Sequence, residues 1–155
     1  MSLYRQLNPR CELFLIGSSA DEAYMRRLRW LVGVLDLVPY VHFAGRVTQS
    51  ELAAYHQTAS VFVSMSEHEG FGIPLVESML FGVPVVAYDS SAVTEAVESA
   101  GILIRHKRLA EWAVVIDHLV RDTALRQQVI AAQNQRAQAY SIARWEQSLR
   151  DILYL

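Results

Sequence analysis

Short apolar runs that alternate with amphipathic stretches constrain the fold of this chain more than any other feature of its sequence. Five runs have the length and composition of strands, and they cover residues 11–16, 40–44, 61–64, 84–88 and 101–104. We expect the first of them to be a buried strand. Strands separated by helices form βαβ units. The pattern therefore predicts an α/β fold with a Rossmann-like, doubly wound parallel sheet.

The expected helices carry recognisable boundary signals. Thr48 and Glu51 form a capping box, in which each side chain can bond the other residue's amide. Pro74 suits the first turn of a helix over 75–81, and Gly82 ends it. A later helix is predicted from one apolar face, formed by Leu109, Trp112, Ile116, Leu119 and Val120. A last helical segment is predicted from the spacing of Ile142, Trp145, Leu149 and Ile152.

Composition narrows the class of protein. The 155 residues are 52% hydrophobic with a formal net charge of -2, which favours one soluble domain over 1–155 and no nucleic-acid partner. The single cysteine, Cys11, cannot form an internal disulfide. No apolar run approaches the roughly 18 residues of a membrane span. We therefore expect a cytoplasmic location. The basic run 105–108 is interpreted as a solvated helix entry.

One segment, residues 66–78, has the features of an anion site. It directly follows the run at 61–64, which places it at the carboxyl end of a strand, where ligands bind in such sheets. Gly70 and Gly72 flank Phe71, and we expect both glycines to adopt positive φ and let a ligand approach the backbone. The first-turn amides after Pro74 are expected to point outward with the positive end of the helix dipole. A diphosphate fits this description.

Two carboxylates in the same segment need a different partner. Glu69 precedes the helix and Glu77 is expected in its first turn. Because a carboxylate repels phosphate, both should face hydroxyl groups, and the vicinal diols of a sugar and a ribose are suitable donors. Amides for the phosphates and one glutamate for each sugar predict a nucleotide-sugar site.

The segment EGFGIPLVES also resembles the E-x7-E signature of the group 1 retaining glycosyltransferases, which have the two-domain GT-B architecture. The resemblance extends from about Glu12 to Leu149, through VHFAGRV at 41–47 and FGVPVVA at 81–87. It implies that the chain is the C-terminal, donor-binding half of a GT-B fold.

The resemblance also implies roles for individual residues. Glu69 would lie on the reacting face as the catalytic residue, and Glu77 would bind the ribose. Arg46 and Val47 would contact the base. Six residues would bind the donor sugar or diphosphate: Ser66, His68, Gly70, Phe71, Gly72 and Ile73.

The implied reaction transfers a hexosyl group from an NDP-sugar, with UDP or GDP as the expected nucleotide, to an acceptor hydroxyl with retention. Retaining glycosidases place two carboxylates about 5 Å apart across the bond, whereas Glu69 and Glu77 would serve different sugars. We therefore assign no covalent nucleophile and favour same-face attack, with the leaving phosphate taking the acceptor proton. No Asp-x-Asp motif occurs and no two His are spaced as ligands, so no metal and no cofactor are expected.

The same resemblance implies missing parts. In the family, an earlier strand and loop carry an Arg and a Lys that neutralise the diphosphate, and an N-terminal Rossmann-like domain binds the acceptor. We therefore expect residues 1–155 to be a fragment that is inactive or nearly so alone. Polysaccharide or glycolipid assembly at the inner face of a membrane, with peripheral association, is the family-level expectation.

Two other classes remain open. A nucleotide-sugar epimerase of the same architecture would share this nucleotide-binding half. A flavodoxin-like signalling module would need an acidic cluster at the strand ends, where Asp89 is the only candidate. A dinucleotide site is disfavoured because no G-x-G-x-x-G follows the first strand.

Overall fold

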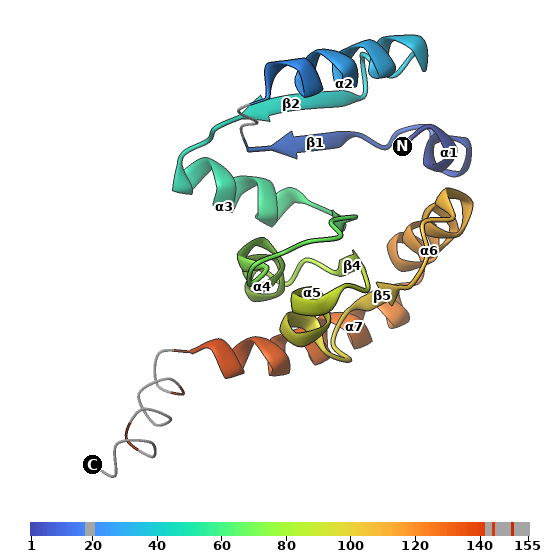
Figure 1. Ribbon diagram of the computed structural model, residues 1–155. Helices are drawn as coiled ribbons and strands as arrows, with labels where there is room; N and C mark the ends of the chain where they lie inside the picture. Colours follow the sequence, from blue (N-terminus) through green and yellow to red (C-terminus); the bar gives the residue numbers. More distant parts are fainter. Residues whose placement is uncertain (18–20, 142–143, 145–149, 151–155) are drawn as a thin grey trace.

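The computed structural model describes residues 1–17, 21–141, 144 and 150 (Figure 1). The N-terminal part contains α1 (Ser2–Leu7), β1 (Leu13–Ile16), α2 (Glu22–Val34), β2 (Val41–Gly45) and α3 (Gln49–Thr58). The middle contains β3 (Phe62–Ser64), α4 (Ile73–Leu80), β4 (Val85–Tyr88), α5 (Ser91–Val97) and β5 (Ile102–Ile104). Two long helices, α6 (Leu109–Arg121) and α7 (Thr123–Ala137), precede a short 3-10 helix, η1 (Gln138–Tyr140).

Each pairing between the described strands is parallel, as the βαβ pattern predicts, but these strands form two sheets. β1 pairs with β2, with Leu13 opposite Val41. β3 pairs with β4 and β4 pairs with β5, which gives the order β3-β4-β5. Within the described residues, no ladder joins β1 to β3, so each of these strands has one edge without a strand partner. Figure 1 shows β1 between β2 and the second sheet.

The core lies on both faces of the β3-β4-β5 sheet. Val85 and Ala87 of β4 pack with α4, α5 and α7 on one face. Val86, the residue between them, packs with Trp112 and Leu119 of α6 on the other. Alternation along β4 thus buries successive side chains under different helices. All three β4 residues are fully buried, as expected for a central parallel strand.

The first strand is less buried than the sequence predicts. We expected a buried strand over 11–16, whereas β1 covers Leu13–Ile16 and leaves Phe14 45% and Ile16 39% exposed. The prediction failed because burial of a strand depends on its neighbours. β1 has one partner strand, and α2 buries none of its own residues.

Helix boundaries follow the predicted signals closely. The capping box is confirmed: Thr48 Oγ1 accepts from the amide of Glu51 at 3.3 Å, and Glu51 Oε2 accepts from the amide of Thr48 at 2.7 Å. The helix α4 begins at Ile73, two residues before the predicted start. α1 was not predicted. The last predicted segment, with Ile142, Trp145, Leu149 and Ile152, lies outside the described residues.

Within the part of the chain that the structure describes, no helix combines the length and apolar character needed to cross a bilayer.

Candidate donor-binding site

The loop from β3 to α4 holds most of the predicted site residues. β3 ends at Ser64 and α4 begins at Ile73, so the chain between them leaves the carboxyl end of a parallel strand and enters a helix N-terminus. Glu69 is half-buried, and His68 and Phe71 are exposed. The structure thus places this stretch where α/β sheets bind ligands.

Gly72 is required for the loop to enter α4. It is the N-cap residue with φ +78°, and a Cβ atom there would lie 2.7 Å from Leu75 Cδ1. The expectation for Gly70 was wrong, because Gly70 does not adopt positive φ. A Cβ on Gly70 would meet no atom within 4 Å, so the space beside its backbone is open. One glycine therefore shapes the turn and the other leaves room.

The helix N-terminus offers fewer amides than predicted. The amides of Leu75 and Val76 both donate to the carbonyl of Gly72, at 2.9 and 3.3 Å, and Pro74 has no N–H. The expectation of outward-pointing first-turn amides therefore holds at most for Gly72 and Ile73. Ile73 is 60% exposed, whereas Gly72 is buried.

Glu77 is half-buried and lies in the second turn of α4, not in the first as predicted, because the helix starts earlier. Helix-dipole stabilisation falls off beyond the first turn, so it does not account for a carboxylate here. Glu77 is close enough to His56 of α3 to affect its charge. Burial lowers the pKa of His56, and the Glu77 carboxylate partly opposes this. Because Glu77 is half-buried, its side chain is not sealed in the interior.

Ser66 forms hydrogen bonds with other residues of the protein. Its hydroxyl donates to the carbonyl of His68 at 3.1 Å, and its own carbonyl accepts from Ser90 Oγ at 3.3 Å. The Ser66 proton is therefore used to shape the loop. The structure supports a loop-stabilising role for Ser66, and the contribution of His68 to this contact is its backbone carbonyl.

The basic run at 105–108 is engaged in ion pairs with acidic residues. Lys107 Nζ donates to Glu67 Oε1 at 2.8 Å and lies over the Tyr88 ring, and the hydrogen bond from Lys107 lowers the pKa of Glu67. Arg105 pairs with Asp89 at 3.0 Å. Hydrogen bonds from Thr94 and from Arg105 lower the pKa of Asp89. These pairs connect the segment that follows β5 to the loops after β3 and β4.

Arg46 and Val47 lie apart from this loop in the topology. They follow β2, in the other sheet, where Gly45 has φ +68°. Arg46 is exposed and Val47 is half-buried. Two groups of predicted site residues follow the carboxyl ends of strands, as expected: Arg46 and Val47 follow β2, and the loop from Ser66 follows β3. It brings Ser66 to Glu77 together in one loop and helix, and leaves the predicted base contacts on the β1-β2 sheet.

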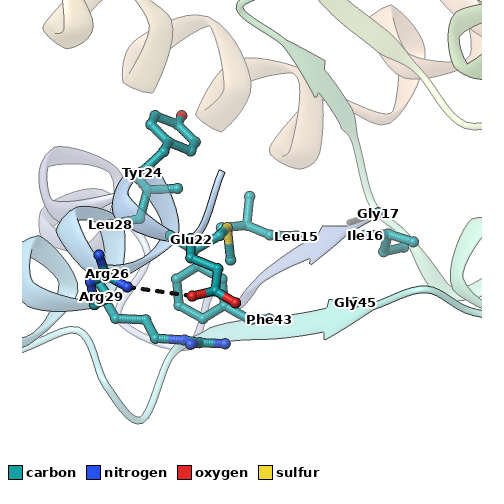
Figure 2. A pocket seen from close by; sticks show the side chains of 11 residues that line it. Leu15, Ile16, Gly17, Glu22, Tyr24, Arg26, Leu28, Arg29, Phe43 and Gly45 are labelled. Atoms are coloured by element: carbon teal, nitrogen blue, oxygen red, sulfur yellow. Dashed lines mark ion pairs between the residues drawn. The ribbon is translucent and has the colours of Figure 1, made fainter. Parts of the chain in front are cut away.

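In the described part of the chain, one hollow lies beside the β1-β2 sheet and a smaller one lies beside the predicted loop. The larger, about 600 Å³, lies between α2 and the β1-β2 sheet (Figure 2). Leu15 and Phe43 line it from the sheet, while Tyr24 and an ion pair of Glu22 with Arg26 line it from α2. It contains none of the predicted site residues.

The smaller hollow, about 240 Å³, does involve the predicted loop. Gly70 and Phe71 line it with Glu95 of α5, Arg136 of α7 and Tyr140 of η1. Arg136 and Tyr140 were not predicted from the sequence, because both are distant along the chain from the loop that they contact.

Among the residues that the structure describes, no group of three or more His, Cys, Asp or Glu side chains is arranged to hold a metal ion.

Substituting the two glycines should separate their roles. Gly72→Ala is expected to lower the free energy of unfolding by about 1–3 kcal/mol, because alanine is strained at φ +78° and its Cβ meets Leu75. Gly70→Ala should leave stability within about 0.5 kcal/mol of wild type, since the added atom meets open space. Urea unfolding measures both. Equal losses for the two variants would contradict the assigned backbone geometry.

The comparisons with known proteins agree with this geometry. The family described as glycosyl transferases group 1 matches residues 1–136. A D-inositol 3-phosphate glycosyltransferase of Jonesia denitrificans is 29% identical over 148 residues, which cover 94% of this chain and 34% of that protein. The chain thus spans about a third of the length of curated relatives such as this one.

Solved structures show the same fold. Anabaena Alr3699/HepE in complex with UDP-glucose superposes with a TM-score of 0.84 at 25% identity, over 99% of this chain and 44% of that one. The C-terminal domain of a glycosyl transferase group 1 family protein, LpcC from Francisella tularensis, superposes with a TM-score of 0.78 at 23% identity, over 91% of this chain and 75% of that domain. These similarities confirm the predicted Rossmann-like fold, the C-terminal half of a GT-B architecture. The chain belongs to the group 1 glycosyltransferase family.

Proposed function

We propose that this chain is the donor-binding part of a retaining glycosyltransferase, which transfers a hexosyl group from an NDP-sugar to an acceptor hydroxyl. One observation carries the proposal. A glycine in the left-handed conformation starts α4 directly after the β3 loop, with Glu69 before the helix and Glu77 one turn inside it. Amides at the helix start suit the diphosphate, and the two glutamates suit two polyols.

The proposal assigns specific roles in donor binding to several of the predicted site residues. The amides of Gly72 and Ile73 bind the diphosphate, and the open space beside Gly70 lets the donor sugar approach the backbone. Glu69 binds the donor sugar on its reacting face, and Glu77 binds the ribose. Arg46 and Val47 contact the base. The leaving diphosphate takes the acceptor proton, so no protein nucleophile is needed.

The relatives favour uridine as the base. Anabaena Alr3699/HepE, which is 25% identical to this chain, was solved with UDP-glucose and with UDP. We therefore place UDP-sugars ahead of GDP-sugars as donors. The flavodoxin-like alternative finds less support, because Asp89 is engaged by Thr94 and Arg105 and is not a free acceptor for phosphoryl transfer.

The unpaired sheet edges support the proposal that further chain completes the domain. The edges of β1 and β3 that lack partners would both be satisfied by one parallel strand placed between them, which gives the Rossmann strand order. The proposed upstream strand and loop would also bring the two cations that neutralise the diphosphate. An N-terminal domain would bind the acceptor, consistent with the share of the relatives' length that this chain spans.

Thermal unfolding in the presence of nucleotide-sugars tests the proposal. UDP-glucose, GDP-mannose and ADP-glucose are titrated separately against the protein at its natural length. We expect a UDP-sugar to raise the melting temperature in a saturable way, since a ligand that binds only the folded state stabilises it by mass action. Free glucose and uridine are the controls. No shift with any of the three nucleotide-sugars would overturn the proposed function.

A further inference from the structure

The end of α7 and the turn η1 contact the loop of residues 65–72 between β3 and α4, which we call the donor loop. The proposed function assigns no role to α7 or η1. Arg136 is near the end of α7 and Tyr140 is the last residue of η1. Both line the hollow of about 240 Å³ that also contains Gly70 and Phe71. The contacts of these two side chains connect the loop to α5.

Arg136 secures the C-terminal end of α5. Its Nε donates to the carbonyl of Ala96 at 3.2 Å, and its Nη2 donates to the carbonyl of Glu95 at 2.6 Å. Nη1 pairs with Glu98 at 3.0 Å, and the Arg136 side chain is only 19% exposed. A cation that binds the last carbonyls of a helix satisfies acceptors that have no partner within the helix and complements its dipole.

Tyr140 joins this arrangement to the donor loop. Its hydroxyl donates to the carbonyl of Ala96 at 3.0 Å and accepts from Arg136 Nη2 at 2.9 Å. Its ring meets the ring of Phe71 edge to face, with centroids 5.6 Å apart and an interplanar angle of 88°. Such a geometry is favourable beyond simple burial. Phe71 lies between two glycines and is 49% exposed, and the Tyr140 ring contacts it.

The other end of α5 contacts the same loop. Ser90, the N-cap residue of α5, donates to the carbonyl of Ser66 at 3.3 Å. The loop is therefore attached to α5 at Ser66 and, through Tyr140, at Phe71. Between these points lies Glu69, the proposed sugar ligand. Two attachments limit the conformations available to the loop before a ligand binds, and such pre-organisation strengthens binding.

We propose that Arg136 and Tyr140 are positioning residues, which hold Phe71 and thereby set the affinity of the loop for the nucleotide-sugar. This inference rests on the proposed function. Neither side chain needs to touch the donor. Their removal loosens Phe71 and the adjoining backbone, so the loss falls on donor binding and on the donor KM, with kcat changed much less.

A double-mutant cycle on donor binding tests the inference. UDP-glucose binding is measured by calorimetry in the protein at its natural length for wild type, Tyr140→Ala, Phe71→Ala and the double variant. We expect Tyr140→Ala to raise Kd about tenfold. In the Phe71→Ala background the same change should have little further effect, because the ring through which it acts is gone.

Matched variants separate positioning from general damage. Tyr24→Ala removes a tyrosine that is 54% exposed on α2, and it should leave Kd unchanged. Tyr140→Phe keeps the ring contact with Phe71 and loses the hydroxyl, so it should recover most of the affinity lost in Tyr140→Ala. If Tyr140→Ala does not fold, Phe71→Leu tests the same contact from the exposed side and should raise Kd by a similar factor.

The outcomes are distinct. If wild type binds UDP-glucose and Tyr140→Ala binds it equally well, the positioning role is wrong and the proposed function stands. Additive losses in the double variant would likewise overturn a role exerted through Phe71. If wild type binds none of the nucleotide-sugars, the proposed function fails and the inference fails with it.

Discussion

Glu77→Ala is expected to abolish the rise in melting temperature that a UDP-sugar gives the wild-type protein. A carboxylate that accepts two ribose hydroxyls makes two charge-assisted hydrogen bonds, each contributing about 1.5–3 kcal/mol. Losing both should weaken donor binding by a factor on the order of 10² or more. The measurement is thermal unfolding at a fixed UDP-glucose concentration, followed by calorimetric Kd values.

Two observations make this result specific. Glu22→Ala removes an acidic side chain on α2 whose carboxylate is paired with Arg26 at the surface, and it should leave the ligand-induced rise intact. Glu77→Ala should also lower the pKa of His56 further, because Glu77 is the group that opposes the effect of burial there. An NMR titration of His56 reports this in the unliganded protein. If UDP-glucose raises the melting temperature of Glu77→Ala as much as that of wild type, Glu77 is not part of the donor site.

Adding the proposed upstream segment is expected to raise turnover by about 10⁴-fold or more over the 155-residue chain. Departure of a nucleoside diphosphate develops negative charge, and each pre-organised group aimed at such charge contributes about 10²–10³ in rate. The proposal assigns two cations to the proposed upstream strand and loop. The acceptor domain would also exclude water from the reacting centre.

The structure indicates where such a segment would dock. In the proposed order, the added strand lies between β3 and β1 and is followed along the chain by β1 and then β2. The connection from the added strand to β1 therefore runs across the sheet in the same direction as the connection from β1 to β2. Right-handed connections therefore place its helix on the face that α2 covers. α2 leaves Trp30 68% and Val34 58% exposed, an apolar surface that a neighbouring helix would bury. α1 already packs near α6, where Arg121 donates to the carbonyl of Leu7 at 2.8 Å.

Hydrogen exchange checks the docking independently of activity. Amides on the open edges of β1 and β3 should exchange slowly in the extended protein and fast in the 155-residue chain. An extension with its apolar strand residues replaced by serine is the control, and it should restore neither protection nor turnover. If the chain turns over equally fast with and without the proposed upstream segment, the assignment of two catalytic cations to that segment is wrong.

Some features of the candidate site could be predicted from the sequence, and others could not. The spacing of Glu69 and Glu77 around a glycine-rich loop and Pro74 was enough to propose a candidate site, because those residues are local to one loop and one helix. The different backbone conformations of Gly70 and Gly72 were not predictable, since φ depends on how the loop enters α4. Arg136 and Tyr140 were missed because their contacts with α5 span 41 and 44 residues of sequence.

By itself, the sequence determined the parallel α/β class, the approximate strands, the capping box of α3 and the loop that carries the candidate chemistry. These features depend on hydrophobic periodicity and on contacts between residues close along the chain. Only the tertiary structure decided that β1 is exposed, that the strands divide into two sheets, and that α5 and α7 support the donor loop. Burial and long-range contacts depend on which elements become neighbours, and local sequence does not encode that choice.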